Sequence, residues 1–223
     1  NAIKENSKHP LLVNYSVVIS DKSIDEIPTL SAKEKPIPPG YKRKSQLNSR
    51  YIFENFIEGT SNQFAKAAAL SVADTPGQTP YNPLLIYSKP GLGKTHLLQA
   101  IGNKIINYNN NMRVVYLTSE KFMLDFISSI QRNKSTDFIN TYRNVDMLLL
   151  DDAQFFQSKE QTQEQFFHLF NDLFQKGKQI VLTTDCHPSK LKGLKDRLVS
   201  RFQSGLIVDI QPPDLETRIA ILM

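Results

Sequence analysis

Cysteine and tryptophan are nearly absent from this 223-residue sequence, which holds one Cys, Cys186, and no Trp. A single cysteine excludes an internal disulfide and fits a reducing compartment, so we expect a cytoplasmic protein. The four histidines are scattered and offer no metal-ligand spacing. No apolar run approaches the roughly 18 residues of a membrane-spanning helix, and residues 1–10 lack the build of a signal peptide.

The net charge of +5 is unevenly distributed. Residues 1–50 hold nine Lys or Arg against five Asp or Glu, and subtraction from the totals of 27 and 22 leaves 18 against 17 for residues 51–223. The basic excess therefore belongs to the N-terminal segment. Net charge gives no argument that the rest of the chain binds nucleic acid.

Residues 1–45 contain a strand-like piece, 11–19, followed by a stretch rich in Lys, Ser and Pro. The proline spacing forbids a helix and predicts a flexible linker, which we favour over a nucleic-acid-binding arm. Aromatic and apolar residues become frequent after this stretch. We therefore expect one folded domain over residues 46–223, and the 40% apolar content is enough for a sizeable core.

Residues 88–95 read SKPGLGKT and lie between an apolar run, 84–87, and an amphipathic segment, 96–106. This order of strand, loop and helix predicts a phosphate-binding P-loop, because glycines let several N–H groups point inward at a helix N-terminus. Lys94 would reach the β- and γ-phosphates, and Thr95 would hold Mg²⁺. The first position departs from the pattern, since it is Ser88 rather than glycine.

A continuous apolar run, 145–150, ends in Asp151 and Asp152. It predicts a buried parallel strand that delivers two carboxylates at the sheet edge where open α/β proteins bind phosphates. We expect Asp151 to bind Mg²⁺ through water and Asp152 to orient or deprotonate the attacking water. The alternative, two acids that merely cap a helix, fits poorly at the end of an all-apolar strand.

Strand-like and helical segments alternate along the domain, which predicts a three-layer α/β fold around a five-stranded parallel sheet. The expected strands are 84–87, 113–118, 145–150, 179–184 and 205–210. One helix, which follows Thr118, carries apolar residues at helical spacing, and our default interpretation is that they pack in the core. These residues are Phe122, Met123, Phe126, Ile127 and Ile130.

Asp185 follows the fourth expected strand and could sense the γ-phosphate or the attacking water. Arg197 and Arg201 lie one turn apart on a short helix. If they lie far around the sheet from the P-loop, the nucleotide of a neighbouring subunit is their expected target. Surface salt bridges to Asp196 or Asp209 are the alternative.

Further sequence blocks accompany the P-loop and the acid pair in a defined order. They are 51–56 (YIFENF), 62–65 (NQFA), 81–83 (YNP), 91–96 (GLGKTH), 151–152 with 154–156 (DD, QFF), 164–168 (EQFFH), 196–198 (DRL) and 200–202 (SRF). Together they resemble the DnaA family of bacterial chromosomal replication initiators, which are AAA+ ATPases. The resemblance covers residues 47–223 and is far more specific than a P-loop alone.

The resemblance implies a weak ATPase that binds ATP or ADP with Mg²⁺ and uses hydrolysis as a switch. It assigns nucleotide binding to Phe56, Asn62, Gly91, Leu92, Gly93, Lys94, Thr95 and His96. Asp185 would be the first sensor. Arg201 would be an arginine finger that acts between subunits, with Arg197 in support.

The family assembles an ATP-dependent filament on origin DNA and opens the duplex. By resemblance, Ile127, Lys159 and Thr162 would contact single-stranded DNA. Gln161 stands where the family normally has Arg, which removes one positive charge from that contact. The resemblance also implies a replicative helicase or its loader as a partner of the N-terminal region, and acidic phospholipids as a further partner.

Residues 1–45 would be the end of an N-terminal interaction domain and a variable linker. The family's lid and its duplex-DNA-binding domain would follow residue 223, so duplex recognition is not expected in this chain. Two alternatives stay open. One is a helicase-loader or initiator-regulator relative, and the other is an ATP-dependent scaffold with negligible hydrolysis.

Overall fold

The computed structural model describes residues 46–108 and 111–223, and our predictions for residues 1–45 lie outside these ranges. After α1 each strand is followed by one or more helices, as the sequence pattern predicted. In chain order the elements are η1 (Phe53–Asn55), α1 (Gln63–Asp74), β1 (Leu84–Tyr87), α2 (Lys94–Tyr108), β2 (Val114–Thr118), α3 (Ser119–Gln131), α4 (Ser135–Arg143), β3 (Met147–Asp151), η2 (Ala153–Phe156), α5 (Glu160–Gln175), β4 (Gln179–Thr184), η3 (Pro188–Lys190), α6 (Asp196–Phe202), β5 (Leu206–Asp209) and α7 (Leu215–Leu222), where η marks a short 3₁₀ helix.

The five strands form one parallel sheet in the order β2-β3-β4-β1-β5, which confirms the predicted five-stranded α/β fold. Leu85 of β1 lies opposite Leu182 of β4 on one side and Ile207 of β5 on the other. Because all strands run in the same direction, the segments that follow them leave the sheet at one edge. The loops after β1, β3 and β4 therefore meet there.

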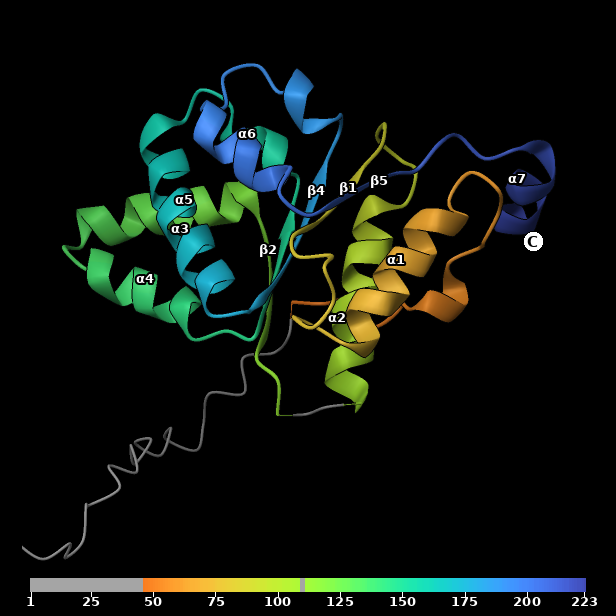
Figure 1. Cartoon of the computed structure of the whole chain (residues 1–223), viewed down its shortest axis with the longest axis horizontal. Coiled ribbons are helices and arrows are strands. Elements are labelled where there is room, and N and C mark those ends of the chain that lie inside the picture. The colour runs from red at the N-terminus through yellow and green to blue at the C-terminus, as the bar shows by residue number, and fades with distance from the viewer. Residues whose placement is uncertain (1–45, 109–110) are drawn as a thin grey trace, which may run out of the picture. The chain divides into compact units, whose positions relative to one another are not determined.

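Alternate residues of each strand face opposite layers of helices. Leu84 and Ile86 belong to a core cluster with α1 and α2, whereas Leu85 belongs to a cluster with α3, α4, α5 and α6. Figure 1 shows these two groups of helices on opposite faces of the sheet. Within the described residues, no helix combines the length and the apolar character that a bilayer span requires.

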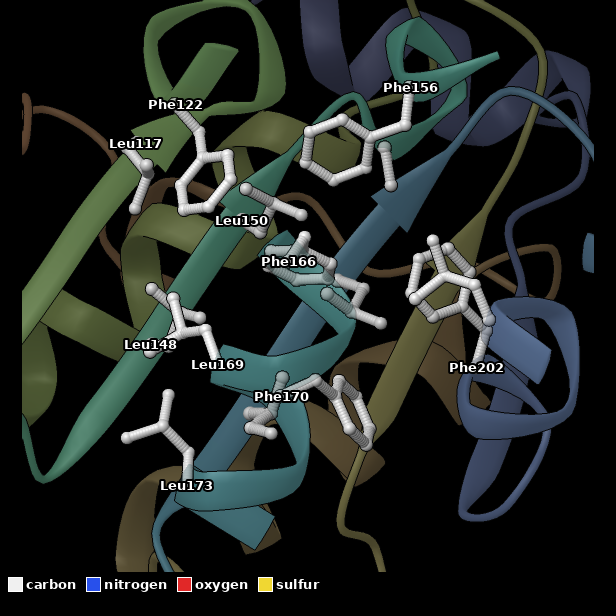
Figure 2. Close-up of a cluster of buried hydrophobic side chains, with 14 of the residues drawn as sticks. Leu117, Phe122, Leu148, Leu150, Phe156, Phe166, Leu169, Phe170, Leu173 and Phe202 are labelled. Carbon is white, nitrogen blue, oxygen red and sulfur yellow. The ribbon is translucent and has the colours of Figure 1, made fainter. Parts of the chain in front are cut away.

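Phe166 of α5 is the centre of an aromatic cluster that joins several elements (Figure 2). Its ring centroid lies 4.9 Å from that of Phe156, 5.5 Å from Phe122 and 6.3 Å from Phe202. All four side chains are at most 1% exposed. Since Phe156 belongs to η2, this cluster fixes the turn that directly follows the acid pair.

The predicted core face of α3 is only partly correct. Phe122 and Phe126 are buried, but Ile127 is 43% exposed and Ile130 is 45% exposed. The reason is that Phe122 and Phe126 belong to the core cluster with α4 and α5, whereas Ile127 and Ile130 belong to neither core cluster of the described residues. These two side chains of α3 therefore face outward, as does Leu124, which is 62% exposed.

Candidate functional site

The carboxyl ends of β1, β3 and β4 surround a cavity of about 400 Å³. The predicted site residues along its wall are Gly91, Gly93, Lys94, Thr95, His96, Asp152 and Asp185. The volume lies in the range of small-molecule binding sites. The fold thus brings the P-loop, Asp152 directly after β3 and Asp185 directly after β4 into one site.

The P-loop backbone depends on two glycines in the left-handed region, Gly91 with φ +82° and Gly93 with φ +96°. A Cβ atom on Gly93 would lie 3.0 Å from a ring carbon of Phe56, so both angle and space favour glycine there. Ser88 is buried and its φ is not positive. The serine at the first P-loop position therefore carries no left-handed strain.

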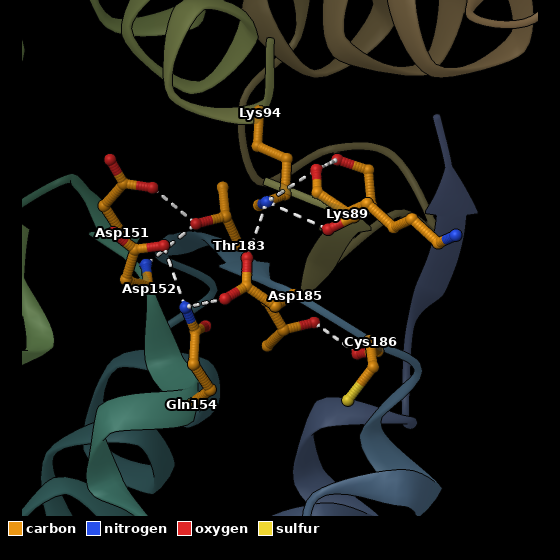
Figure 3. Close-up of polar contacts among 10 residues, drawn as sticks. Lys89, Lys94, Asp151, Asp152, Gln154, Thr183, Asp185 and Cys186 are labelled. Atoms are coloured by element: carbon orange, nitrogen blue, oxygen red, sulfur yellow. Dashed lines mark hydrogen bonds and ion pairs between the residues drawn. The ribbon is translucent and has the colours of Figure 1, made fainter. Parts of the chain in front are cut away.

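Lys94, the first residue of α2, lines the cavity although it is only 6% exposed. Its ammonium group donates to Asp185 Oδ1 at 2.8 Å, to the Ser88 carbonyl at 2.9 Å and to the Lys89 carbonyl at 3.4 Å (Figure 3). A buried ammonium needs such partners, because an unpaired buried charge is costly. The site therefore contains a positive charge with a fixed position.

Asp152 leaves β3 in a left-handed conformation, with φ 56° and ψ 51°. Its backbone N–H donates to Thr183 Oγ1 at 2.8 Å. The side-chain amide of Gln154 donates to Asp152 Oδ1 at 3.0 Å and to Asp185 Oδ2 at 2.8 Å (Figure 3). Burial raises the pKa of Asp152, the charge of Asp151 raises it further, and the hydrogen bond from Gln154 opposes this rise.

Asp151 is 2% exposed and does not line the cavity. Its Oδ1 accepts a hydrogen bond from the Thr183 hydroxyl at 2.5 Å, and its Oδ2 accepts one from the Tyr116 hydroxyl at 3.0 Å. Burial raises the pKa of Tyr116, and the charge of Asp151 raises it further, so this hydroxyl remains a donor. Both carboxylate oxygens of Asp151 thus have protein partners, which fits action through an intervening water better than direct contact with an ion.

A second pocket of about 230 Å³ shares part of the cavity wall, including His96. Phe56, Asn62 and Leu92, which the resemblance assigned to nucleotide binding, line this second pocket. Asn62 Oδ1 accepts a hydrogen bond from the Gly59 N–H at 3.0 Å, which fixes this segment. A pocket with apolar and amide walls beside a cationic loop suits a base that is attached to a phosphate chain.

Arg197 lies outside both pockets and is bound within its own chain. It forms an ion pair with Glu164 at 3.3 Å, and its guanidinium carbon lies 4.7 Å from the ring centroid of Phe167. A hydrogen bond from Arg197, together with its charge, holds the pKa of Glu164 below its usual value. The salt-bridge partner is thus Glu164, and neither Asp196 nor Asp209 as the alternative supposed.

Arg201 is half-exposed and also lies outside both pockets. Its guanidinium carbon lies 6.0 Å from the ring centroid of Phe174. Among residues 46–108 and 111–223, no carboxylate forms an ion pair with it. No carboxylate of these residues therefore offsets the charge of Arg201.

The resemblance matched three residues to a contact with single-stranded DNA, and these residues differ in how far they are exposed to solvent. Ile127 is 43% exposed, and Lys159 is exposed at the N-cap of α5. Thr162 is only 5% exposed, because its side chain lies on the inner face of α5. The match of these three residues to a contact with single-stranded DNA stays a prediction.

Three polar residues of the site were missed by the sequence reasoning: Gln154, Thr183 and Tyr116. Gln154 occupies a position that the P-loop pattern does not specify. Thr183 and Tyr116 lie in the strands on either side of β3. A polar side chain in an apolar strand needs a buried partner, and that signal could have identified Thr183.

The comparison with known families places these residues in a wider context. Residues 47–209 match the family described as bacterial DnaA ATPase domain. Domain III of the replication initiation protein DnaA from Thermotoga maritima is 50% identical, with a TM-score of 0.77 over 79% of this chain and 73% of that one. DnaA from Aquifex aeolicus, solved with AMPPCP, is 43% identical, with a TM-score of 0.75 over 80% of this chain and 55% of that one.

A replication initiator DnaA bound to AMPPCP and single-stranded DNA is 44% identical, with a TM-score of 0.74 over 78% of this chain and 53% of that one. The chain thus spans only about half the length of the two relatives solved with AMPPCP. The family match covers well over half of the sequence printed above. The chain therefore belongs to the bacterial DnaA family.

Proposed function

We propose that residues 46–223 are the ATP-binding core of a bacterial replication initiator. The observation that carries this proposal is the fixed ammonium group of Lys94 in the cavity wall, between the two left-handed glycines and Asp185. Family membership favours the initiator over the helicase-loader and initiator-regulator alternatives.

ATP binding follows from the charges of the site. The triphosphate of ATP carries about four negative charges, which need inward-pointing N–H groups and a cation. Lys94 supplies the cation, and the loop through Gly91 and Gly93 supplies the backbone groups. The adjoining pocket with Phe56 and Asn62 would hold the base. ADP would bind as well, because the loop amides hold the α- and β-phosphates.

The side chains near the cavity fit a magnesium ion that is held largely by phosphates and water. Mg²⁺ keeps several waters and is bound through one or two carboxylates together with substrate phosphates. Within the described residues, no three His, Cys, Asp or Glu side chains form a metal cluster of their own. Thr95 and, through water, Asp151 would hold the ion. When bound, the ion would neutralise charge on the β- and γ-phosphates.

Asp152 is the residue we assign to orienting or deprotonating the attacking water. Its pKa is raised mainly by burial, which favours proton uptake, and Gln154 helps to keep it ionised. We assign Asp185 to sensing the γ-phosphate or the attacking water. We propose that hydrolysis is weak and acts as a switch, and that Arg201 supplies its charge to the nucleotide of a neighbouring subunit.

We also propose that the ATP state assembles into a filament on origin DNA, with Ile127, Lys159 and Thr162 on single strands. The relative solved with AMPPCP and single-stranded DNA supports this contact. We propose that duplex origin DNA is recognised by the duplex-DNA-binding domain of the family rather than by residues 46–223. A replicative helicase or its loader would bind the N-terminal region, and acidic phospholipids are a further proposed partner.

The single Cys186 supports a cytoplasmic location.

Calorimetric titration with ATP and ADP tests nucleotide binding. Both nucleotides should bind the unaltered protein, and Lys94→Ala should abolish binding because it removes the cation at the phosphates. The matched control is Lys89→Ala, which removes an exposed charge from the same loop. Near-unchanged affinity in Lys94→Ala would end the P-loop assignment.

Turnover separates an ATPase from a scaffold. ATP hydrolysis by the full-length protein that disappears in Asp152→Asn would support a catalytic role for this carboxylate. ATP binding without measurable turnover in the full-length protein would instead favour the nucleotide-dependent scaffold.

A further inference from the structure

The side-chain amide of Gln154 lies between two carboxylates that follow different strands (Figure 3). Its nitrogen lies 3.0 Å from Asp152 Oδ1 and 2.8 Å from Asp185 Oδ2. An amide nitrogen carries two N–H groups, so each carboxylate can accept one. A flipped amide would point its oxygen at both acids, so the hydrogen-bond network assigns the nitrogen to this side.

We propose that Gln154 is a positioning residue for ATP hydrolysis, which fixes the carboxylate of Asp152 relative to that of Asp185 by giving one N–H group to each. This inference rests on the proposed function of the site.

The two acids need such a bridge because like charges repel at short range. Asp185 gives its other oxygen to Lys94 at 2.8 Å, so it is held on both sides. Asp152 accepts the bond from Gln154 through Oδ1 alone. Within the described residues, no hydrogen-bond donor reaches its Oδ2. Gln154 thus fixes one oxygen of Asp152 and leaves the other to take a proton from water.

Gln154 is itself held by a rigid turn. It belongs to η2, and Phe156 two residues later is fully buried against Phe122 and Phe166. The Oε1 atom of Gln154 is buried, and no donor among the described residues forms a hydrogen bond with it. An unpaired buried acceptor lowers stability, so packing alone does not favour glutamine here. What the Gln154 side chain contributes to the site is its two hydrogen bonds, one to the carboxylate of Asp152 and one to that of Asp185.

The test replaces Gln154 in the full-length protein by Met, which has a similar length and no donor group. We expect kcat to fall on the order of 10- to 100-fold, the usual effect of removing a hydrogen-bond partner from a catalytic group. The Kd for ATP should stay within about threefold, because Gln154 donates to no phosphate in this scheme. The melting temperature should not fall. A kcat within about twofold of the unaltered protein would overturn the inference.

Two further variants separate donor chemistry from shape. Gln154→Glu keeps the shape but replaces both N–H groups by oxygens, so its loss of kcat should be at least as large as that of Gln154→Met. A Glu variant with full kcat would overturn the role of the donors. Gln157→Met is the matched control, since in the described part of the chain the side chain of Gln157 forms no hydrogen bond, and it should keep normal kcat.

Crystal structures without nucleotide give a readout apart from activity. In Gln154→Met the Asp152 carboxylate should leave the place it holds in the unaltered protein, and an unmoved carboxylate would overturn the inference. Absence of turnover in the unaltered protein would overturn the proposed function and this inference together. Normal turnover of the unaltered protein with an undiminished kcat in Gln154→Met would overturn this inference alone.

Discussion

The ammonium group of Lys94 lies 2.8 Å from Oδ1 of Asp185, so the cation of the P-loop already has a carboxylate partner within the protein. A phosphate that binds in the loop must compete with this carboxylate for the same positive charge. The Asp185 side chain is 38% exposed, so solvent screens part of the attraction. The ion pair therefore sets a modest cost on phosphate binding.

Replacement of Asp185 by Asn should tighten ADP binding, because the competing charge is removed. A partly exposed ion pair is worth up to about 1 kcal/mol, which corresponds to a Kd about fivefold lower. Calorimetric titration measures the change. Asp209→Asn, at the last residue of β5 and outside the cavity, is the control and should leave Kd unchanged. A Kd more than tenfold higher in Asp185→Asn would mean that Asp185 stabilises the bound nucleotide directly.

Replacement of Arg201 by Ala should leave the ATP affinity of the monomer almost unchanged, because this arginine lines neither pocket. It should nevertheless prevent ATP-dependent assembly of the full-length protein, since the charge it would meet is the γ-phosphate of a neighbour. Sedimentation with ATP and with ADP measures assembly. Arg143→Ala, which removes an ion pair with Asp172 at 3.1 Å, is the control and should assemble normally. Normal assembly of Arg201→Ala would refute the role between subunits.

Replacement of Lys159 by Ala should weaken single-stranded DNA binding of the ATP-bound assembly. The slope of log K against log salt should flatten by roughly one unit, because one phosphate contact is lost. Fluorescence anisotropy over a range of salt concentrations measures the slope. Lys176→Ala, at the opposite end of α5, is the charge-matched control. If the slope of Lys159→Ala equals that of the control, the basic N-terminal segment rather than α5 makes the phosphate contact.

Asp146 should make folding stability depend on pH in the acid range. Burial acts against its ionised form, but hydrogen bonds from the Arg113 N–H at 2.9 Å and from Lys178 at 2.6 Å hold the pKa of Asp146 below its usual value. A depressed folded-state pKa gives stability that is present above the unfolded-state pKa, near 4, and is lost as pH falls through the folded-state value. The stability advantage over Asp146→Asn should thus be constant near neutral pH and shrink below about pH 4.

Urea unfolding of the full chain at a series of pH values measures this advantage. Asp137→Asn is the control, because the Asp137 side chain is exposed on α4. An advantage of the unaltered protein over Asp146→Asn that persists undiminished to pH 3 would show that the ion pair does not account for it.

Local pattern was sufficient for the strands and for the loop that holds Lys94. The predicted strand 84–87 has the same bounds as β1. A short apolar run directly before a glycine loop is compatible with few structures other than a strand. The orientation of Ile127 could not be predicted in the same way. Helical spacing shows which residues share a face, but not how far the neighbouring elements extend over that face. The contact between Gln154 and Asp185 depends on tertiary structure alone, since 31 positions separate them.

The left-handed backbone conformation of Asp152 limits which residue types this position tolerates. Glycine, Asn and Asp are the residues that accept such angles most readily, and of these Asp alone carries a carboxylate. This accounts for a short acid where a longer one would reach further. A single codon change to Asn would preserve the fold, so screening variants of this position by stability would rank Asn beside Asp. Because the proposed function needs the carboxylate for ATP hydrolysis, only selection for ATP turnover would distinguish Asp from Asn at this position.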